Sequence, residues 1–115
     1  YPKEFRARFN LGKILYRMGD RQGYLSEMRE VMAIAPKQAE GYLFLARGLL
    51  DESGSLEDVK SLVEKGLSLA QTGELKAFGY FLLADIYSRT HQPEKMRAAL
   101  DKANSYKSRK ENVDD

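Results

Sequence analysis

The sequence predicts an all-α protein made of three successive helix-turn-helix units, and three observations support this prediction. A Leu-Gly or Leu-Ala pair begins at Leu11, Leu45 and Leu83, at intervals of thirty-four and thirty-eight residues. Within each interval, apolar residues lie three or four positions apart in two blocks, as they do on amphipathic helices. Apolar and polar residues nowhere alternate for long enough to indicate a strand.

Six helices are expected, and turn and capping residues separate them. They span residues 4–18, 21–34, 38–52, 56–70, 75–89 and 93–107. Gly19 favours a left-handed stop after the first helix, and Asp20 is a suitable N-cap for the second. Ser55–Asp58 forms a capping box ahead of the fourth helix. Pro36 and Pro93 fit first-turn positions, where a missing N–H costs nothing.

The period divides the chain into units of unequal length. Pro2 lies one period before Pro36, so we interpret residues 1–4 as the end of a preceding repeat and expect a fragment of a longer array, with six to seven helices in all. Three extra residues fall mainly within 71–76. The expected repeats are 5–38, 39–73 with a one-residue insertion, and 77–110, followed by a polar tail at 111–115.

The repeated positions resemble the tetratricopeptide repeat family over nearly the whole chain. The matching residues are Leu11, Gly12, Leu15, Met28 and Pro36, then Tyr42, Leu45, Ala46, Leu49 and Val63, then Tyr80, Leu83, Ala84, Tyr87 and Leu100. This resemblance implies a right-handed α-solenoid in which the first helix of each pair lines a concave groove. Departures from the family pattern include Arg8 at the first aromatic position and Tyr24 where alanine is usual.

Composition places the chain among globular domains. It has 115 residues, of which 43% are hydrophobic and 31% charged, with a net charge of +2. The basic residues near the C-terminus, from Lys102 to Lys110, indicate a solvated tail rather than a nucleic-acid surface. No apolar run reaches the roughly 18 residues of a membrane helix, so we expect no membrane insertion. The sequence leaves the compartment open.

Nothing in the sequence predicts catalysis, a metal site or a cofactor. The single histidine, His91, falls in the turn between the last two helices, and the chain contains no cysteine. Spacings typical of phosphate loops, zinc proteases and calcium loops are absent. We therefore expect a protein that is not an enzyme.

A stripe along the three first helices is the candidate partner-binding groove. Its residues are Arg6, Phe9, Asn10, Lys13, Arg17, Phe44, Arg47, Phe78, Phe81, Asp85 and Arg89. Glu40, Leu43 and Leu82 share this stripe. Aromatic and arginine side chains dominate binding hot spots. An alternative is that Phe9, Leu43 and Phe44 fill the seam between neighbouring first helices.

Chaperone-binding members of the tetratricopeptide repeat family hold a terminal carboxylate with a clamp of lysine, asparagine and arginine on successive first helices. At the corresponding positions this chain has Phe9, Phe44, Phe78 and Leu82, which cannot pair with a carboxylate. The groove is better suited to an apolar helix or an extended peptide whose acidic flanks meet Lys13, Arg17 and Arg47.

The predicted function is a non-catalytic scaffold that binds a protein or peptide. Two alternatives stay open: a structural array that self-associates through open repeat ends, and an accessory region of a larger bacterial envelope, secretion or sulfatase-like protein, which short strings such as LLADIYSR resemble. Nucleic-acid binding is disfavoured because the stripe carries phenylalanine and leucine. The first helix is expected to expose an apolar side including some of Phe5, Phe9 and Ile14.

Overall fold

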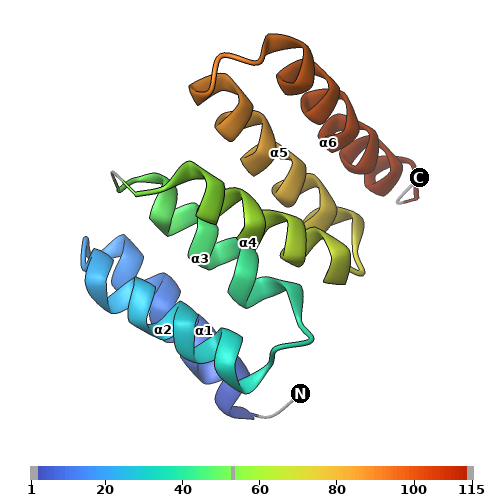
Figure 1. The fold of residues 1–115 in the computed structure, drawn as a ribbon. Helices are drawn as coiled ribbons and strands as arrows, with labels where there is room; N and C mark the ends of the chain where they lie inside the picture. Colours follow the sequence, from blue (N-terminus) through green and yellow to red (C-terminus); the bar gives the residue numbers. More distant parts are fainter. Residues whose placement is uncertain (1–2, 53, 114–115) are drawn as a thin grey trace.

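The computed structural model describes residues 3–52 and 54–113, with side chains described as far as Lys107. Within these residues the secondary structure is entirely helical (Figure 1). The six helices are α1 (Lys3–Arg17), α2 (Arg21–Ile34), α3 (Ala39–Leu50), α4 (Leu56–Leu69), α5 (Gly73–Arg89) and α6 (Pro93–Val113). The all-α prediction is confirmed for the described part of the chain.

Consecutive helices form three hairpins, α1–α2, α3–α4 and α5–α6, which follow one another in chain order (Figure 1). Neighbouring hairpins contact each other through α2 with α3 and through α4 with α5. The first helices α3 and α5 also pack on one another. This arrangement places α1, α3 and α5 close enough for their side chains to share one surface.

Two of the hairpin turns close with the same backbone geometry. Gly19 and His91 have positive φ, 82° and 57°, and each lies two residues past the end of its helix, α1 or α5. The amide of Asp20 donates a 2.9 Å hydrogen bond to the carbonyl of Leu15, five residues earlier. The amide of Gln92 donates an equivalent 2.9 Å bond to the carbonyl of Tyr87. This is a Schellman motif, which satisfies carbonyls that the helix end leaves open. His91 therefore occupies a glycine-type position that the sequence did not reveal.

Side-chain caps define the starts of three helices. Asp20 accepts a 2.9 Å hydrogen bond from the amide of Gly23, and Ser55 accepts one of 3.4 Å from Asp58. These two caps were predicted. Thr72 accepts a 3.1 Å bond from the amide of Leu75, so α5 begins earlier than expected. Residues 73–76, where extra residues were predicted, form the first turn of α5.

The predicted placement of Pro36 in the first turn of a helix is wrong. Pro36 lies in the turn before α3, because Gln38 is extended at φ −104° and ψ 141° and acts as the N-cap. The predicted end of α6 at residue 107 is also too early, since residues 108–113 contain no glycine or proline that would stop a helix. Our interpretation of Pro2 and of the last two tail residues lies outside the described part of the chain.

Small residues allow the helices to approach closely. A Cβ added to Gly12 would lie 2.3 Å from the methyl group of Met28, and one added to Gly79 would lie 2.4 Å from the Leu67 side chain. Ala46 and Ala84 are also buried. A larger side chain at these positions would push the helix axes apart.

Candidate functional site

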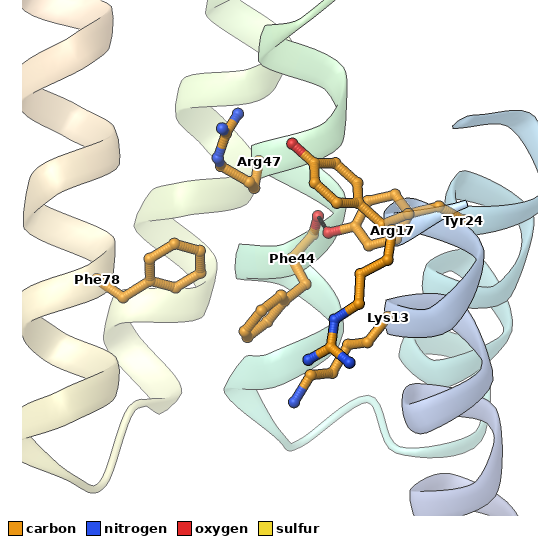
Figure 2. Close-up of a pocket in the computed structure, with 7 residues that line it drawn as sticks. Lys13, Arg17, Tyr24, Phe44, Arg47 and Phe78 are labelled. Carbon is orange, nitrogen blue, oxygen red and sulfur yellow. Dashed lines mark hydrogen bonds between the residues drawn. The ribbon is translucent and has the colours of Figure 1, made fainter. Parts of the chain in front are cut away.

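A pocket of about 280 Å³ opens between the first helices (Figure 2). It is lined by Lys13, Tyr16 and Arg17 of α1, Tyr24 of α2, Phe44 and Arg47 of α3, and Phe78 of α5. Its wall thus combines four aromatic rings with three cationic side chains. Five of these seven residues belong to the predicted groove.

A row of aromatic rings connects the three first helices across the pocket. Phe9 meets Phe44 edge to face with ring centroids 4.8 Å apart, and Phe44 lies 4.8 Å from Phe78. Figure 2 shows Phe78 of α5 and Phe44 of α3 pointing toward one another. Each ring is half-buried in the seam between the first helices, and those of Phe44 and Phe78 also face the pocket. The seam alternative therefore describes all three phenylalanines, and Phe44 and Phe78 also border the pocket.

Tyr24 forms the inner wall of the pocket. Its side chain is buried, its hydroxyl donates a hydrogen bond to the Phe44 carbonyl, and its ring centroid is 5.0 Å from that of Tyr16. Burial, followed by the neighbouring Tyr16, raises the pKa of the Tyr24 phenol above its usual value. The inner wall therefore stays uncharged into the alkaline pH range.

Sequence reasoning missed both tyrosines. Tyr16 lies three positions after Lys13 and thus on the same side of α1, a signal that the sequence contained. Tyr24 belongs to a second helix and was noted only as a departure from a small residue. Its size is accommodated by Gly48, because a Cβ there would come within 2.6 Å of the Tyr24 ring.

The three pocket cations differ in their partners. Lys13 places its Nζ atom 5.4 Å from the centroid of the Phe9 ring. Arg47 forms a 3.3 Å ion pair with Asp51. Burial acts to lower the pKa of Arg47, but Tyr16 and Asp51 raise it by more, so the net direction is upward. Arg17 is exposed and has no ion pair within the described residues. The pocket therefore has a net positive rim.

Six predicted groove residues do not line this pocket: Phe9, Asp85, Arg89 and three residues with exposed side chains. Arg6 and Asn10 are exposed on α1, and Phe81 is exposed on α5. None of the three is among the pocket-lining residues. The predicted groove therefore extends along all three first helices, but only its central part borders the pocket.

Asp85 and Arg89 form an ion pair with each other, and Arg89 also contacts the end of α3. Their side chains form a 2.8 Å ion pair, and Arg89 Nη1 also donates a 2.7 Å hydrogen bond to the carbonyl of Leu50. Leu50 is the last residue of α3, where the helix dipole favours a cation. These contacts join the ends of α3 and α5 and give Arg89 a structural role.

Leu43 and Leu82 are core residues rather than groove residues. Both are buried within the largest hydrophobic cluster, which extends from α3 to α6. Placing them on the stripe was wrong, because a helix that packs on three neighbours buries more than one face. Glu40 is half-buried, and its Oε1 atom has no hydrogen-bond partner in the described structure.

No histidine, cysteine, aspartate or glutamate is among the residues that line the pocket. His91 is exposed in the turn between α5 and α6. Among the described residues, no group of three or more His, Cys, Asp or Glu side chains is placed to hold a metal ion. In the same part of the chain, no helix combines the length and apolar character that a membrane crossing requires.

No family model matches this chain, and none of the curated proteins searched is significantly similar to it. The resemblance to tetratricopeptide repeats therefore rests on the spacing of the residues given above.

Proposed function

We propose that this protein is a non-catalytic helical-repeat scaffold that binds a segment of a partner protein in the pocket between α1, α3 and α5. In this proposal the three hairpins are tetratricopeptide-type repeats of a right-handed solenoid, and the pocket is the central part of its concave surface. The order in which the hairpins contact one another supports this arrangement.

The single observation that supports the proposal most strongly is the composition of the pocket wall. Aromatic rings from three first helices and one second helix meet there beside three cations. Rings and guanidinium groups supply large contact areas and directional polar contacts, which is why they dominate binding energies at protein interfaces. A purely structural seam does not need an exposed cationic rim.

The pocket chemistry selects the kind of segment. A volume of about 280 Å³ is suited to one or two apolar side chains. Lys13 and Arg17 extend from α1 beside Phe44 (Figure 2), where carboxylates flanking the apolar anchor would meet them. The proposed ligand is therefore a peptide with a central apolar or aromatic pair between acidic residues.

The test uses a fluorescent peptide with a central Leu-Phe pair between aspartates and glutamates, titrated with the whole chain and followed by anisotropy. The double substitution Lys13→Glu with Arg17→Glu should raise Kd about tenfold or more, because it reverses two charges at the rim. Lys37→Glu with Lys65→Glu is a matched control, since both lysines are exposed away from the pocket.

A second peptide, with the Leu-Phe pair replaced by two alanines, separates anchoring from simple charge attraction. It should bind at least about tenfold more weakly than the first, because its apolar anchor is missing. The proposal is wrong if both double variants weaken binding equally, or if the alanine peptide binds as well as the original.

A further inference from the structure

The free side of α1 carries an exposed apolar stripe that is separate from the pocket. Leu11 is 44% exposed, Ile14 is 50% exposed and Met18, just beyond the helix, is 74% exposed. Together with Ala7 they follow a spacing of four, three and four residues, which aligns them along one side of a helix. Pocket residues such as Lys13 and Tyr16 lie on a different side of α1.

The corresponding stripes of α3 and α5 are helix-packing surfaces. The thirty-four-residue period aligns Ala7, Leu11 and Ile14 with Gly41, Leu45 and Gly48. In α3, a Cβ on Gly41 would lie 2.8 Å from the Met32 backbone, one on Gly48 would lie 2.8 Å from the Leu25 side chain, and Leu45 is buried in a cluster with Leu25 and Met28. Gly79 of α5 faces Leu67 of α4 in the same way.

The exposed stripe of α1 therefore corresponds in the repeat to the surfaces through which α3 packs on α2 and α5 packs on α4. In α1 the same surface has no helix packed against it within the described residues. A helix with a ridge of leucine and methionine side chains, such as α2 presents to α3, is the matching shape.

Basic side chains along one edge of the stripe favour a partner that carries negative charge. Lys3 and Arg17 border the stripe at helical spacing, and Arg6 and Lys13 lie beyond them, all exposed. None of these four side chains forms an ion pair within the described residues, whereas Arg8 on the opposite edge is paired with Glu4 and Glu27 at 3.3 Å each. One edge of the stripe is thus cationic and unpaired.

A second copy of this chain is a poor occupant. Two α1 helices would bring together surfaces with five basic residues and one acidic residue each. The helix α6 is no better, because the period aligns Leu25 and Met32 of α2 with Arg97 and Asn104, which are polar and exposed. Neither α1 nor α6 of a second copy therefore combines an apolar ridge with the negative charge that would complement the stripe.

We propose that the stripe of Ala7, Leu11, Ile14 and Met18 is a second docking surface, which takes an amphipathic helix of a partner protein with an apolar ridge and an acidic flank. The apolar ridge packs on the stripe as α2 packs on α3. The acidic flank lies along the edge formed by Lys3 and Arg17. The apolar residues of the stripe lie outside the pocket, although Arg17 borders both surfaces, and the proposal does not depend on the function proposed for the pocket.

The test uses two synthetic helical peptides with the same ridge of leucine and methionine, one flanked by glutamates and the other by lysines. Binding to the whole chain is followed by anisotropy and by amide shifts in NMR spectra. The glutamate peptide should bind about tenfold or more tightly than the lysine peptide, with the largest shifts along α1. Added salt should narrow this difference.

Leu11→Gln with Ile14→Gln should weaken the glutamate peptide about tenfold or more, because it removes the centre of the ridge contact. Phe81→Gln is the matched control, since Phe81 is a comparably exposed apolar residue, at 39%, on another helix. Should the double variant fold poorly, Met18→Gln replaces it, because that side chain makes few contacts of its own.

Several outcomes would overturn the proposal. Equal affinity for the two peptides would remove the charge argument, and a complete lack of binding would remove the docking surface itself. Shifts confined to the pocket, with no effect of the Leu11 and Ile14 substitutions, would place the peptide elsewhere. A dimeric mass in light scattering that these substitutions abolish would identify a second copy as the occupant.

Discussion

Ionisation of Tyr24 should lower the free energy of unfolding at high pH. Burial raises the pKa of its phenol, so the folded state retains the proton above the pH at which the unfolded chain loses it. The stabilisation is therefore complete below the ordinary tyrosine pKa of 10.0 and declines as the pH rises beyond it. Loss of the hydroxyl in Tyr24→Phe should cost about 1 kcal/mol of unfolding free energy at pH 8.

The stability advantage of the wild type over Tyr24→Phe should fall as the pH rises from 10 toward 12, and the variant should become the more stable protein within this range. Urea unfolding of both proteins at several alkaline pH values measures it. Because the other titrating groups are common to the two proteins, their contributions cancel in the comparison. A constant difference across this range would show that Tyr24 does not titrate abnormally.

Two turn residues with positive φ give opposite expectations for substitution. His91 adopts φ 57°, which costs a residue with a Cβ about 1 kcal/mol, so His91→Gly should raise the unfolding free energy by about 0.5 to 1 kcal/mol. Gly19 adopts φ 82°, and Gly19→Ala should lower the unfolding free energy by about 1 kcal/mol. Nothing lies within 4 Å of a Cβ placed on Gly19, so the loss would come from the backbone alone. Thermal unfolding of both variants tests the pair, and changes of the same sign would contradict the expectation.

At the scale of helices, the aromatic row determines how α1, α3 and α5 share a surface. Phe44 contacts Phe9 and Phe78 and is half-buried, so Phe44→Ala should cost about 2 kcal/mol of stability, less than a fully buried phenylalanine. Phe81 is exposed and lies outside the pocket, and Phe81→Ala should change stability by less than about 1 kcal/mol.

Binding of the acidic Leu-Phe peptide should respond to the same two substitutions differently. Under conditions where both variants are folded, Phe44→Ala should raise Kd about tenfold or more, and Phe81→Ala should leave it within about twofold. A comparison of denaturation midpoints with anisotropy titrations separates stability from binding. If Phe81→Ala alone weakened the peptide, the binding surface would lie farther along α5 than the pocket.

At the scale of the whole molecule, the hairpins should tolerate extension at α1. Inserting a copy of residues 5–38 ahead of Phe5 preserves the thirty-four-residue period and brings the copied α2 against Leu11 and Ile14. Covering this stripe should raise the melting temperature by about 5 °C. The stripe itself was only partly foreseen, since Ile14 is exposed as expected whereas Phe5 is buried beside Val31 and Ala35.

The control for this extension is the same insertion with the copied Leu25 and Met32 changed to glutamate. These are the side chains through which α2 packs on α3. The control should melt near the temperature of the original chain, because its added helix cannot bury an apolar ridge against α1. Identical melting temperatures for the two extended proteins would contradict the hairpin-on-hairpin packing of the array.

The sequence alone was sufficient to predict the helices, because apolar spacing and capping are local properties of the chain. Gly19, Asp20 and Ser55 end or begin helices through contacts with residues at most five positions away. The repeated Leu11, Leu45 and Leu83 similarly indicated three units without any knowledge of their packing. Most of the pocket residues on α1, α3 and α5 could be found this way, since helical periodicity places them on one side of each helix.

Only the tertiary structure decided which members of the stripe face the cavity and which are buried. Leu43 and Phe44 are adjacent in the sequence, yet Leu43 lies in the core while Phe44 borders the pocket. Tyr24 reaches the pocket from a second helix because Gly48 leaves room for its ring, and Arg89 is drawn to the end of α3 by the Leu50 carbonyl. These outcomes depend on contacts between residues twenty or more positions apart, where helix packing rather than helical periodicity sets the distances.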